Sequence, residues 1–413
     1  MKGLYIVLAG LFSLQFAQSQ EIIRKGIWRG ELLRSDGNAI VINFEVVHKD
    51  NTTKLFILNA GDRLEVDDVS KKGDSVIIKM PFFDSQFRVK ARGKDRLEGT
   101  WIKTLADRHV VIPFTARNNE SYRFKIKSKA RPADVSGRWA VNFVDTAGRS
   151  MPSVGVFAQS GNKLTGSFLT PYGDYRYLEG VVDGDSLKLS GFDGGYAQLF
   201  RAKVGEDGSI QNGAFYTGAG PATQVWHAVR DDNAVLPDAS AAAHVKEGME
   251  PRLDFTFKDS DGNPVSINDE CYKNKVIILQ ILGSWCPNCL DEAPLFIEMY
   301  NQYRDQGLEI IGLSYERTED FTKSQAAVRN FIRRLKINYP VLIAPVAVGD
   351  TLRTEKTLPQ INKIPAFPTT IFIGRDGRIS SIHSGFNGPG TGEEEYSKQK
   401  AEYRHIAEEL LSR

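Results

Sequence analysis

The chain has 413 residues, of which 41% are hydrophobic and 25% are charged, with 53 basic and 51 acidic side chains. This length is enough for two or three domains. The charges nearly balance and form no long run of one sign, which argues against a nucleic-acid partner or an acidic membrane surface.

The first residues have the pattern of a secretory signal peptide. Lys2 precedes an apolar run over residues 4–12, and small residues then suit cleavage before Gln20. The apolar run is too short to span a membrane, and no other stretch reaches about 18 unbroken apolar residues. We therefore expect residues 1–19 to be removed and the mature protein to be exported to the periplasm (cell envelope) without a membrane span.

The next part of the chain contains an internal repeat. Gly26-Ile27-Trp28 recurs as Gly137-Arg138-Trp139, 111 residues later, and a Gly-Asp-Ser turn recurs with the same offset. Short runs rich in β-branched and aromatic residues alternate with Gly-rich turns in both halves. The pattern predicts two copies of an antiparallel all-β module, residues 20–130 and 131–230, each folded as a sandwich or barrel.

The C-terminal part has a different pattern. Residues 231–250 are rich in small residues and lack periodicity, which predicts a linker. Residues 251–413 then alternate apolar strand-like runs, such as 276–282 and 369–373, with amphipathic helical stretches. The order β-α-β-α-β followed by β-β-α is typical of an α/β thioredoxin-like domain.

Two cysteines, Cys286 and Cys289, lie two residues apart where a buried strand gives way to a helix. Unpaired backbone N–H groups and the helix dipole favour a thiolate there, so we expect the pKa of Cys286 to lie below the ordinary value of about 8.5. A thiolate attacks disulfides, and Cys289 is one turn further along the helix. Three cysteines are too few for a disulfide scaffold in an exported chain, which favours a catalytic pair. We expect the third, Cys271, to pack as a small, partly buried hydrophobe.

Residues 251–413 resemble the TlpA-like (ResA-like) branch of the thioredoxin superfamily, which consists of exported thiol–disulfide oxidoreductases. The resemblance rests on Trp285-Cys286-Pro287-Asn288-Cys289, Glu292 with Pro294, Phe367-Pro368-Thr369-Thr370 and the Asp376-Gly377 turn. It implies that Cys286 is the nucleophile, that Cys289 resolves the mixed disulfide, and that Pro368 is a cis proline facing the pair.

The resemblance also implies a role for Glu292, which lies three residues after Cys289 and so shares its helix face. Glu292 would take the proton from Cys289 during resolution. The alternative is an ordinary glutamate near the amino end of a helix.

Four neighbouring residues are expected to form the client-binding surface: Trp285, Pro287, Phe367 and Thr369. A cis bond before Pro368 would expose the backbone of Phe367 for pairing with an extended client chain. The related proteins usually have a smaller residue before this proline, so Phe367 would alter the shape of the groove. Trp285 either covers the disulfide or packs beside it.

These patterns predict an exported disulfide reductase that acts on cysteine-containing protein clients, takes electrons from an upstream membrane or exported donor, and needs no cofactor or metal. Copper delivery remains an alternative, because copper chaperones on this fold use two cysteines and a downstream histidine, here His383. Those proteins, however, space their cysteines by three residues. A peroxidase would need a peroxidatic cysteine preceded by Thr, which is absent. In a last alternative the β modules bind a ligand or partner, and the redox domain is accessory.

Overall fold

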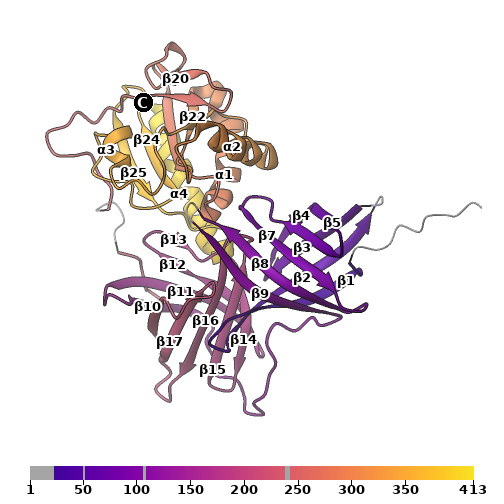
Figure 1. Cartoon of the computed structure of the whole chain (residues 1–413). Helices are drawn as coiled ribbons and strands as arrows, with labels where there is room; N and C mark the ends of the chain where they lie inside the picture. The colour runs from indigo at the N-terminus through magenta and orange to yellow at the C-terminus, as the bar shows by residue number, and fades with distance from the viewer. Residues whose placement is uncertain (1–22, 50–51, 106–107, 238–241) are drawn as a thin grey trace, which may run out of the picture.

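The computed structural model describes residues 23–49, 52–105, 108–237 and 242–413. The predicted signal peptide, residues 1–19, lies outside this part. The N-terminal region forms two barrel-like antiparallel sheets, and the C-terminal region forms a thioredoxin-like α/β unit that rests on both of them (Figure 1). Within the described ranges, no helix is long and apolar enough to cross a membrane.

The first sheet runs in the order β4-β3-β2-β1-β9-β8-β7-β6-β5. Alternate residues of β1 are buried, because strand side chains point to opposite faces, and Trp28 is among those in the core. The end strands β4 and β5 are consecutive in the chain, so the sheet curls on itself. Its strands are β1 (Gly26–Leu33), β2 (Ala39–Lys49), β3 (Thr52–Asn59), β4 (Asp62–Val66), β5 (Asp68–Lys72), β6 (Ser75–Lys79), β7 (Ser85–Ala91), β8 (Arg96–Thr104) and β9 (His109–Asn118).

The second sheet runs in the order β11-β10-β18-β17-β16-β15-β14-β12-β13. A further pairing between β11 and β12 closes this sheet. Its core is rich in aromatic side chains, including Trp139 and Trp226. Its strands are β10 (Gly137–Asp145), β11 (Ser150–Ser160), β12 (Lys163–Thr170), β13 (Gly173–Asp174), β14 (Leu178–Asp183), β15 (Ser186–Phe192), β16 (Ala197–Val204), β17 (Ile210–Thr217) and β18 (Gln224–Arg230).

Buried polar contacts join the two sheets. The Asn59 side chain donates to the Phe192 carbonyl (2.8 Å) and accepts from the Phe192 N–H (3.1 Å). Arg123, in the segment between the sheets, donates to the Ser190 carbonyl and hydroxyl, both at 3.1 Å. Because buried polar groups are costly unless paired, these bonds hold the sheets in one arrangement.

The C-terminal sheet runs in the order β20-β19-β23-β22-β21-β24-β25, with β21 in the middle of its parallel and antiparallel neighbours. The predicted strands 276–282 and 369–373 form with those bounds, and the expected order of strands and helices is confirmed. The elements are β19 (Thr256–Asp259), β20 (Pro264–Ser266), η2 (Glu270–Tyr272), β21 (Val276–Leu282), α1 (Pro287–Tyr303), η3 (Arg304–Gln306), β22 (Leu308–Ser314), α2 (Phe321–Leu335), β23 (Val341–Ile343), α3 (Arg353–Thr357), β24 (Thr369–Ile373), β25 (Ile379–Ser384), η4 (Pro389–Thr391) and α4 (Glu393–Ser412).

Strand β21 is buried on both faces. Val276, Ile278 and Leu282 belong to the hydrophobic core that contains residues of α1, α2 and α4. The alternating residues Ile277 and Ile281 belong to the core on the other face. Burial on both faces explains why this strand reads as a continuous apolar run rather than an alternating one.

The predicted linker, residues 231–250, contacts folded parts at both ends of its described portion. Ala234 packs against the second sheet. Val245 forms a β-bridge with Ile361, and the backbone N–H of His244 donates to Asn362 (2.9 Å). The segment is therefore docked on the C-terminal unit as well as on the second sheet. The domain boundaries themselves stay predictions.

The C-terminal unit packs against the first sheet through α2. Arg334 forms an ion pair with Asp67 (2.8 Å), and Asn330 donates to the Pro81 carbonyl (2.8 Å). One continuous hydrophobic core contains residues of both sheets and of the C-terminal unit. The β region and the α/β unit therefore pack against each other through buried apolar side chains and are not connected by a linker alone.

The second sheet contacts helix α1 directly through the short strand β13 and the residues after it. Arg176 makes a two-pronged ion pair with Asp291 (2.6 and 2.7 Å), whose side chain is only 8% exposed. Gly173 lies so close to Asn288 that a Cβ there would approach the Asn288 amide nitrogen to 2.8 Å. Asn288 and Asp291 belong to the first turns of α1, so this sheet docks on the helix that carries the cysteine pair.

Asp174 is a buried carboxyl at the same contact, and its side chain accepts a hydrogen bond from the Gly388 N–H. Burial, with a smaller contribution from Asp291, raises the pKa of Asp174 from 3.8 to about 7. Between these two values the folded protein keeps a proton that the unfolded chain has lost. The contribution of Asp174 to stability therefore falls as pH rises through this range.

We expect Asp174→Asn to stabilise the protein at pH 8 and to destabilise it slightly at pH 4. The amide oxygen keeps one of the two backbone hydrogen bonds, from Gly388 or from Arg176, the amide nitrogen cannot accept the other, and the group carries no charge. The gain at pH 8 should be about 1 kcal/mol or more, because one pKa unit corresponds to about 1.4 kcal/mol. Thermal unfolding of the wild-type and Asp174→Asn proteins at pH 4 and pH 8 measures the difference in stability.

Asp183→Asn is the matched control on the same sheet. Asp183 is a partly exposed acid whose pKa is lowered by hydrogen bonds from the Ser128 and Lys127 backbone, so its removal should give no gain at pH 8. An Asp174→Asn protein less stable than wild type at pH 8, or shifted equally at both pH values, would contradict this electrostatic assignment.

Candidate active site

The cysteine pair lies at the start of helix α1, directly after β21. Cys286 is the N-cap residue with an extended backbone, and Pro287 occupies the first turn, where its missing N–H costs nothing. The Cys286 sulfur accepts a hydrogen bond from the Cys289 N–H (3.3 Å). Both cysteines are buried free thiols, with Cys286 3% exposed. The predicted position of the pair at a strand–helix junction is confirmed.

The loop before β24 faces this pair. The Phe367–Pro368 peptide bond is cis, as the resemblance implied. The Cys286 thiol donates to the Phe367 carbonyl at 3.2 Å, so the nucleophile candidate contacts the backbone next to the proline. The rings of Trp285 and Phe367 meet edge to face, with centroids 5.4 Å apart.

Three of the four residues predicted to bind the client surround the buried Cys286. Trp285, Pro287 and Phe367 are each partly exposed. The Trp285 indole N–H donates to the Tyr315 carbonyl (2.8 Å), which fixes the ring beside the cysteine. Thr369 differs, because it is fully buried and its hydroxyl donates to a backbone carbonyl inside the same loop. Its side chain therefore does not reach the surface around Cys286.

Glu292 is completely buried one turn after Cys289 and is held by two side chains from the sheet. Gln280 on β21 donates to one carboxyl oxygen, Oε2 (2.7 Å), and Thr370 on β24 donates to the other, Oε1 (2.8 Å). Gln280 and Thr370 are direct partners in the β21–β24 register, so strand pairing brings both donors under the helix.

A third residue fixes the orientation of this network. The Tyr339 hydroxyl donates to the Gln280 carbonyl oxygen (2.9 Å), so the Gln280 amide group must face Glu292. An amide NH₂ only donates, whereas a threonine hydroxyl both donates and accepts. A proton on Glu292 therefore sits on Oε1, the oxygen that faces Thr370.

The pKa values of Glu292 and Cys289 are both raised in this pocket. Burial raises the pKa of Glu292 to about 8, although the Gln280 and Thr370 hydrogen bonds oppose the shift. Burial also raises the pKa of the Cys289 thiol well above its ordinary value, and contact with Cys286 and the charge of Glu292 add to it. Near neutral pH the site therefore holds a neutral thiol beside a mostly protonated carboxyl.

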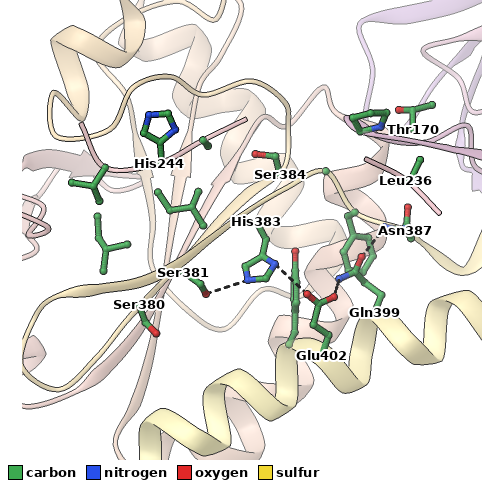
Figure 2. Close-up of a pocket in the computed structure, with 18 residues that line it drawn as sticks. Thr170, Leu236, His244, Ser380, Ser381, His383, Ser384, Asn387, Gln399 and Glu402 are labelled. Carbon is green, nitrogen blue, oxygen red and sulfur yellow. Dashed lines mark hydrogen bonds and ion pairs between the residues drawn. The ribbon is translucent and has the colours of Figure 1, made fainter. Parts of the chain in front are cut away.

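His383 lies apart from the cysteine pair, at a cavity of about 540 Å³ between β25, α4 and the docked segment around His244 (Figure 2). One ring nitrogen faces Glu402 (3.3 Å) and the other faces Ser381 (3.1 Å). In the part of the chain that the structure describes, no three His, Cys, Asp or Glu side chains gather as a metal site would require.

Cys271 differs from its expected partly buried packing. It lies exposed in the short helix η2, while its neighbour Tyr272 is buried. A single tight turn can direct only one of two adjacent side chains inward, and the larger one takes the core position.

Sequence reasoning did not single out Gln280, Thr370 or Tyr339 as parts of the site. One signal was present: Gln280 is the only polar residue in the apolar run 276–282, and a buried amide in a central strand needs hydrogen-bond partners. Asn288 and Asp291 were also missed as contacts of the second sheet, and nothing local in the sequence indicates them.

The fold and the dithiol at the start of α1 define a thioredoxin-like domain. Residues 250–382, most of that domain, match the AhpC/TSA family. Among curated relatives, the thiol-disulfide oxidoreductase ResA of Bacillus thuringiensis subsp. konkukian is 30% identical over 125 residues, which are 30% of this chain and 62% of the relative. ResA of Bacillus subtilis is 26% identical over 131 residues, which are 32% of this chain and 64% of the relative.

The resemblance to ResA-like proteins is thus confirmed for the C-terminal part, and the match spans less than two thirds of these relatives. Solved structures cover the same part. A putative thiol:disulfide interchange protein DsbE from Chlorobium tepidum is 20% identical with a TM-score of 0.31, covering 41% of this chain and 99% of that one. A putative protein disulfide isomerase from Bacteroides thetaiotaomicron is 22% identical with a TM-score of 0.30, covering 40% and 92%.

We expect Thr370→Val to raise the pKa of Glu292 further, by about one unit, because a lost hydrogen bond to a carboxylate costs about 1 kcal/mol or more. Thr370→Ser keeps the hydroxyl and should restore the wild-type value. Carbon-13 NMR of proteins labelled at the glutamate carboxyl carbons measures the titration, with the Glu292 signal assigned by its absence in Glu292→Gln. An unchanged or lower pKa in Thr370→Val would refute the role given to this hydroxyl.

Proposed function

We propose that this protein is an exported thiol–disulfide oxidoreductase that reduces disulfides in protein clients, with Cys286 and Cys289 cycling between dithiol and disulfide. The observation that carries the proposal is the dithiol at the amino end of α1, facing a cis proline and backed by a buried carboxyl. The names of the ResA relatives agree with this class of reaction.

The first step is attack by Cys286 on the client disulfide. The Cys286 sulfur lies at the amino end of α1, where it accepts the Cys289 N–H, and it contacts the loop that carries the cis proline. When the thiol loses its proton, it no longer donates to the Phe367 carbonyl, and that carbonyl becomes free to accept from a client backbone. The attack forms a mixed disulfide, and the first client sulfur leaves as a thiolate that takes up a proton.

The second step needs a deprotonated Cys289, which its surroundings disfavour. Glu292 in its ionised form accepts that proton, on Oε1 beside Thr370. The Cys289 sulfur then attacks Cys286, and the second client sulfur leaves. Burial raises the pKa of Glu292 and so makes its carboxylate a stronger base, which opposes the effect of burial on the Cys289 thiol, a weaker acid for the same reason.

The reducing direction is supported by the environment of Cys289. Burial and the neighbouring carboxyl disfavour its ionised form. Because stabilising the reduced form makes a cysteine pair oxidising, the absence of such stabilisation at Cys289 favours a reducing pair. An upstream membrane or exported donor would return the pair to the dithiol.

We also propose that residues 20–130 and 131–230 are two copies of one module, joined through residues 231–250 to the domain at 251–413. Three features support duplication besides the sequence repeat. In both sheets the first strand pairs with the last, and it begins at a glycine with positive φ, at 26 and 137. In both sheets the tryptophan two residues later donates to the carbonyl four residues before it. Export follows from the signal-peptide pattern at residues 1–19.

The reaction is tested by cysteine substitutions in the insulin reduction assay with dithiothreitol as donor. Cys286→Ser should abolish turnover because the attacking sulfur is lost. Cys289→Ser should accumulate a mixed disulfide between Cys286 and insulin, detectable by non-reducing gel and mass spectrometry. Cys271→Ser is the matched control and should keep wild-type turnover. Full activity of Cys286→Ser would reject the proposal.

The role of Glu292 is tested by the pH dependence of resolution. In wild type the rate of mixed-disulfide resolution should rise with pH and level off above about pH 8, where Glu292 is ionised. Glu292→Gln should slow resolution at pH 7 by about 100-fold, the lower range of general-base contributions, and lose that rise. Rapid-quench measurement of the mixed disulfide gives both profiles. Identical profiles would leave Glu292 as a packing residue only.

A further inference from the structure

Three parts of the chain converge on the surface around Cys286. Lys103 comes from β8 of the first sheet, Tyr196 from the turn between β15 and β16 of the second sheet, and Arg317 from the segment after β22. All three are partly exposed, whereas Cys286 itself is buried. Together with Trp285 they form what we call the cationic rim.

The cationic rim contains two cation–π contacts. The Arg317 guanidinium lies over the Trp285 ring, 5.0 Å from its centroid, and the Lys103 ammonium lies 3.8 Å from the Tyr196 ring centroid. The Tyr196 phenol is within electrostatic range of both Cys286 and Arg317. The rim is therefore next to the reacting sulfur.

Neither positive charge of the rim, on Lys103 or on Arg317, forms an ion pair with a carboxylate in the described ranges of the chain. Asp193 is the acid that acts on Lys103, but its side chain accepts the backbone N–H groups of Gly195 and Tyr196.

Glu316, which precedes Arg317 in the chain, also accepts hydrogen bonds from other groups. The Glu316 carboxylate accepts from the Ser284 N–H and hydroxyl and from the Ser314 hydroxyl. Burial and the repulsion of Arg317 lower the pKa of Lys103 to about 8. Positive charge without a direct carboxylate partner, beside a nearly buried nucleophile, favours an anionic partner at this position.

We propose that the cationic rim selects protein clients whose reactive cysteine is flanked by an aspartate or glutamate. This inference rests on the proposed function and names the substrate class of that site. The client carboxylate pairs with Lys103 and Arg317 while its cysteine sulfur meets Cys286. The rings of Trp285 and Tyr196 cover the backbone and aliphatic parts of the client.

The chemistry stays the balanced exchange already described. The client S–S bond breaks, the Cys286–Cys289 bond forms, and the two client sulfurs gain the two electrons and two protons of the enzyme dithiol. The rim changes the rate of encounter and the orientation of the client, not the redox balance.

The test uses the full chain in its reduced form and three peptide disulfides. The peptides are symmetric disulfide dimers of one sequence that differ only in the residue on each side of the cysteine: Asp, Ser or Lys. Acid quench and mass spectrometry give the second-order rate constant for each. We expect the Asp peptide to react roughly fivefold or more faster than the Ser peptide at low ionic strength, with the Lys peptide slowest, and the spread to shrink in high salt.

Variants separate charge from structure. Lys103→Gln and Arg317→Gln should each lower the Asp-to-Ser rate ratio, and the double variant should bring it close to one. Lys103→Arg and Arg317→Lys should retain the ratio. Lys90→Gln, on the exposed face of the same first sheet where Lys90 pairs with Asp74, should keep the wild-type ratio.

The outcomes distinguish this inference from the proposed function. Equal wild-type rates for the three peptides, or Gln variants that slow all three in the same proportion, would overturn the selection of acidic clients while the oxidoreductase stands. No oxidation of the dithiol by any of the peptides would overturn the proposed function itself.

Discussion

The arrangement of the site depends on the ion pair between Arg176 and Asp291. This ion pair holds the second sheet against the first turns of helix α1, which carry the cysteine pair. A buried ion pair stabilises only when its geometry is good and its remaining groups are bonded, and here both carboxylate oxygens receive guanidinium hydrogen bonds. Two residues before Asp291 is Cys289, and Asn288 on the same turn donates to the Asp174 carbonyl (3.2 Å). The second sheet is thus bonded to the redox motif itself.

This docking changes how the β region should be understood. A tethered binding module would leave the cysteine pair as open as in an isolated domain. Here the shared hydrophobic core and the contacts after β13 fix the sheets against α1, the helix that begins at the Cys286 cap. Lys103 and Tyr196 reach the site because their sheets are fixed to α2 and α1. The same contacts that bury apolar surface therefore decide which groups a client meets first.

The sequence predicts much of the C-terminal unit, because its signals are local. An apolar run buried on both faces identifies β21, and the cysteine spacing at its end fixes the start of α1. The Glu292 network is different, since Gln280 and Thr370 meet through the pairing of β21 with β24 and Tyr339 joins them from the loop before β23, a tertiary arrangement that no local pattern encodes. The contact of β13 with α1 joins residues more than a hundred positions apart, so neither periodicity nor spacing could indicate it. Thr369 shows that a residue's position next to a motif does not fix the direction of its side chain. It follows the cis proline, but its hydroxyl donates to a backbone carbonyl of its own loop instead of facing the client.

The buried carboxyls are most favourable to folding when protonated, whereas the proposed reaction needs one of them ionised. Burial raises the pKa of Asp174 to about 7 and that of Glu292 to about 8, so each carboxyl favours the folded state more at lower pH. The proton transfer assigned to Glu292 needs its ionised form, which is the form that the surrounding core disfavours. The Gln280 and Thr370 hydrogen bonds reduce that cost without removing it, and so keep the pKa of Glu292 near 8 rather than higher. A fully apolar pocket would be more stable but could not take the proton of Cys289, and a solvated carboxyl would have a lower pKa and be a weaker base. The polar residue in the middle of β21 is therefore the compromise between these two requirements.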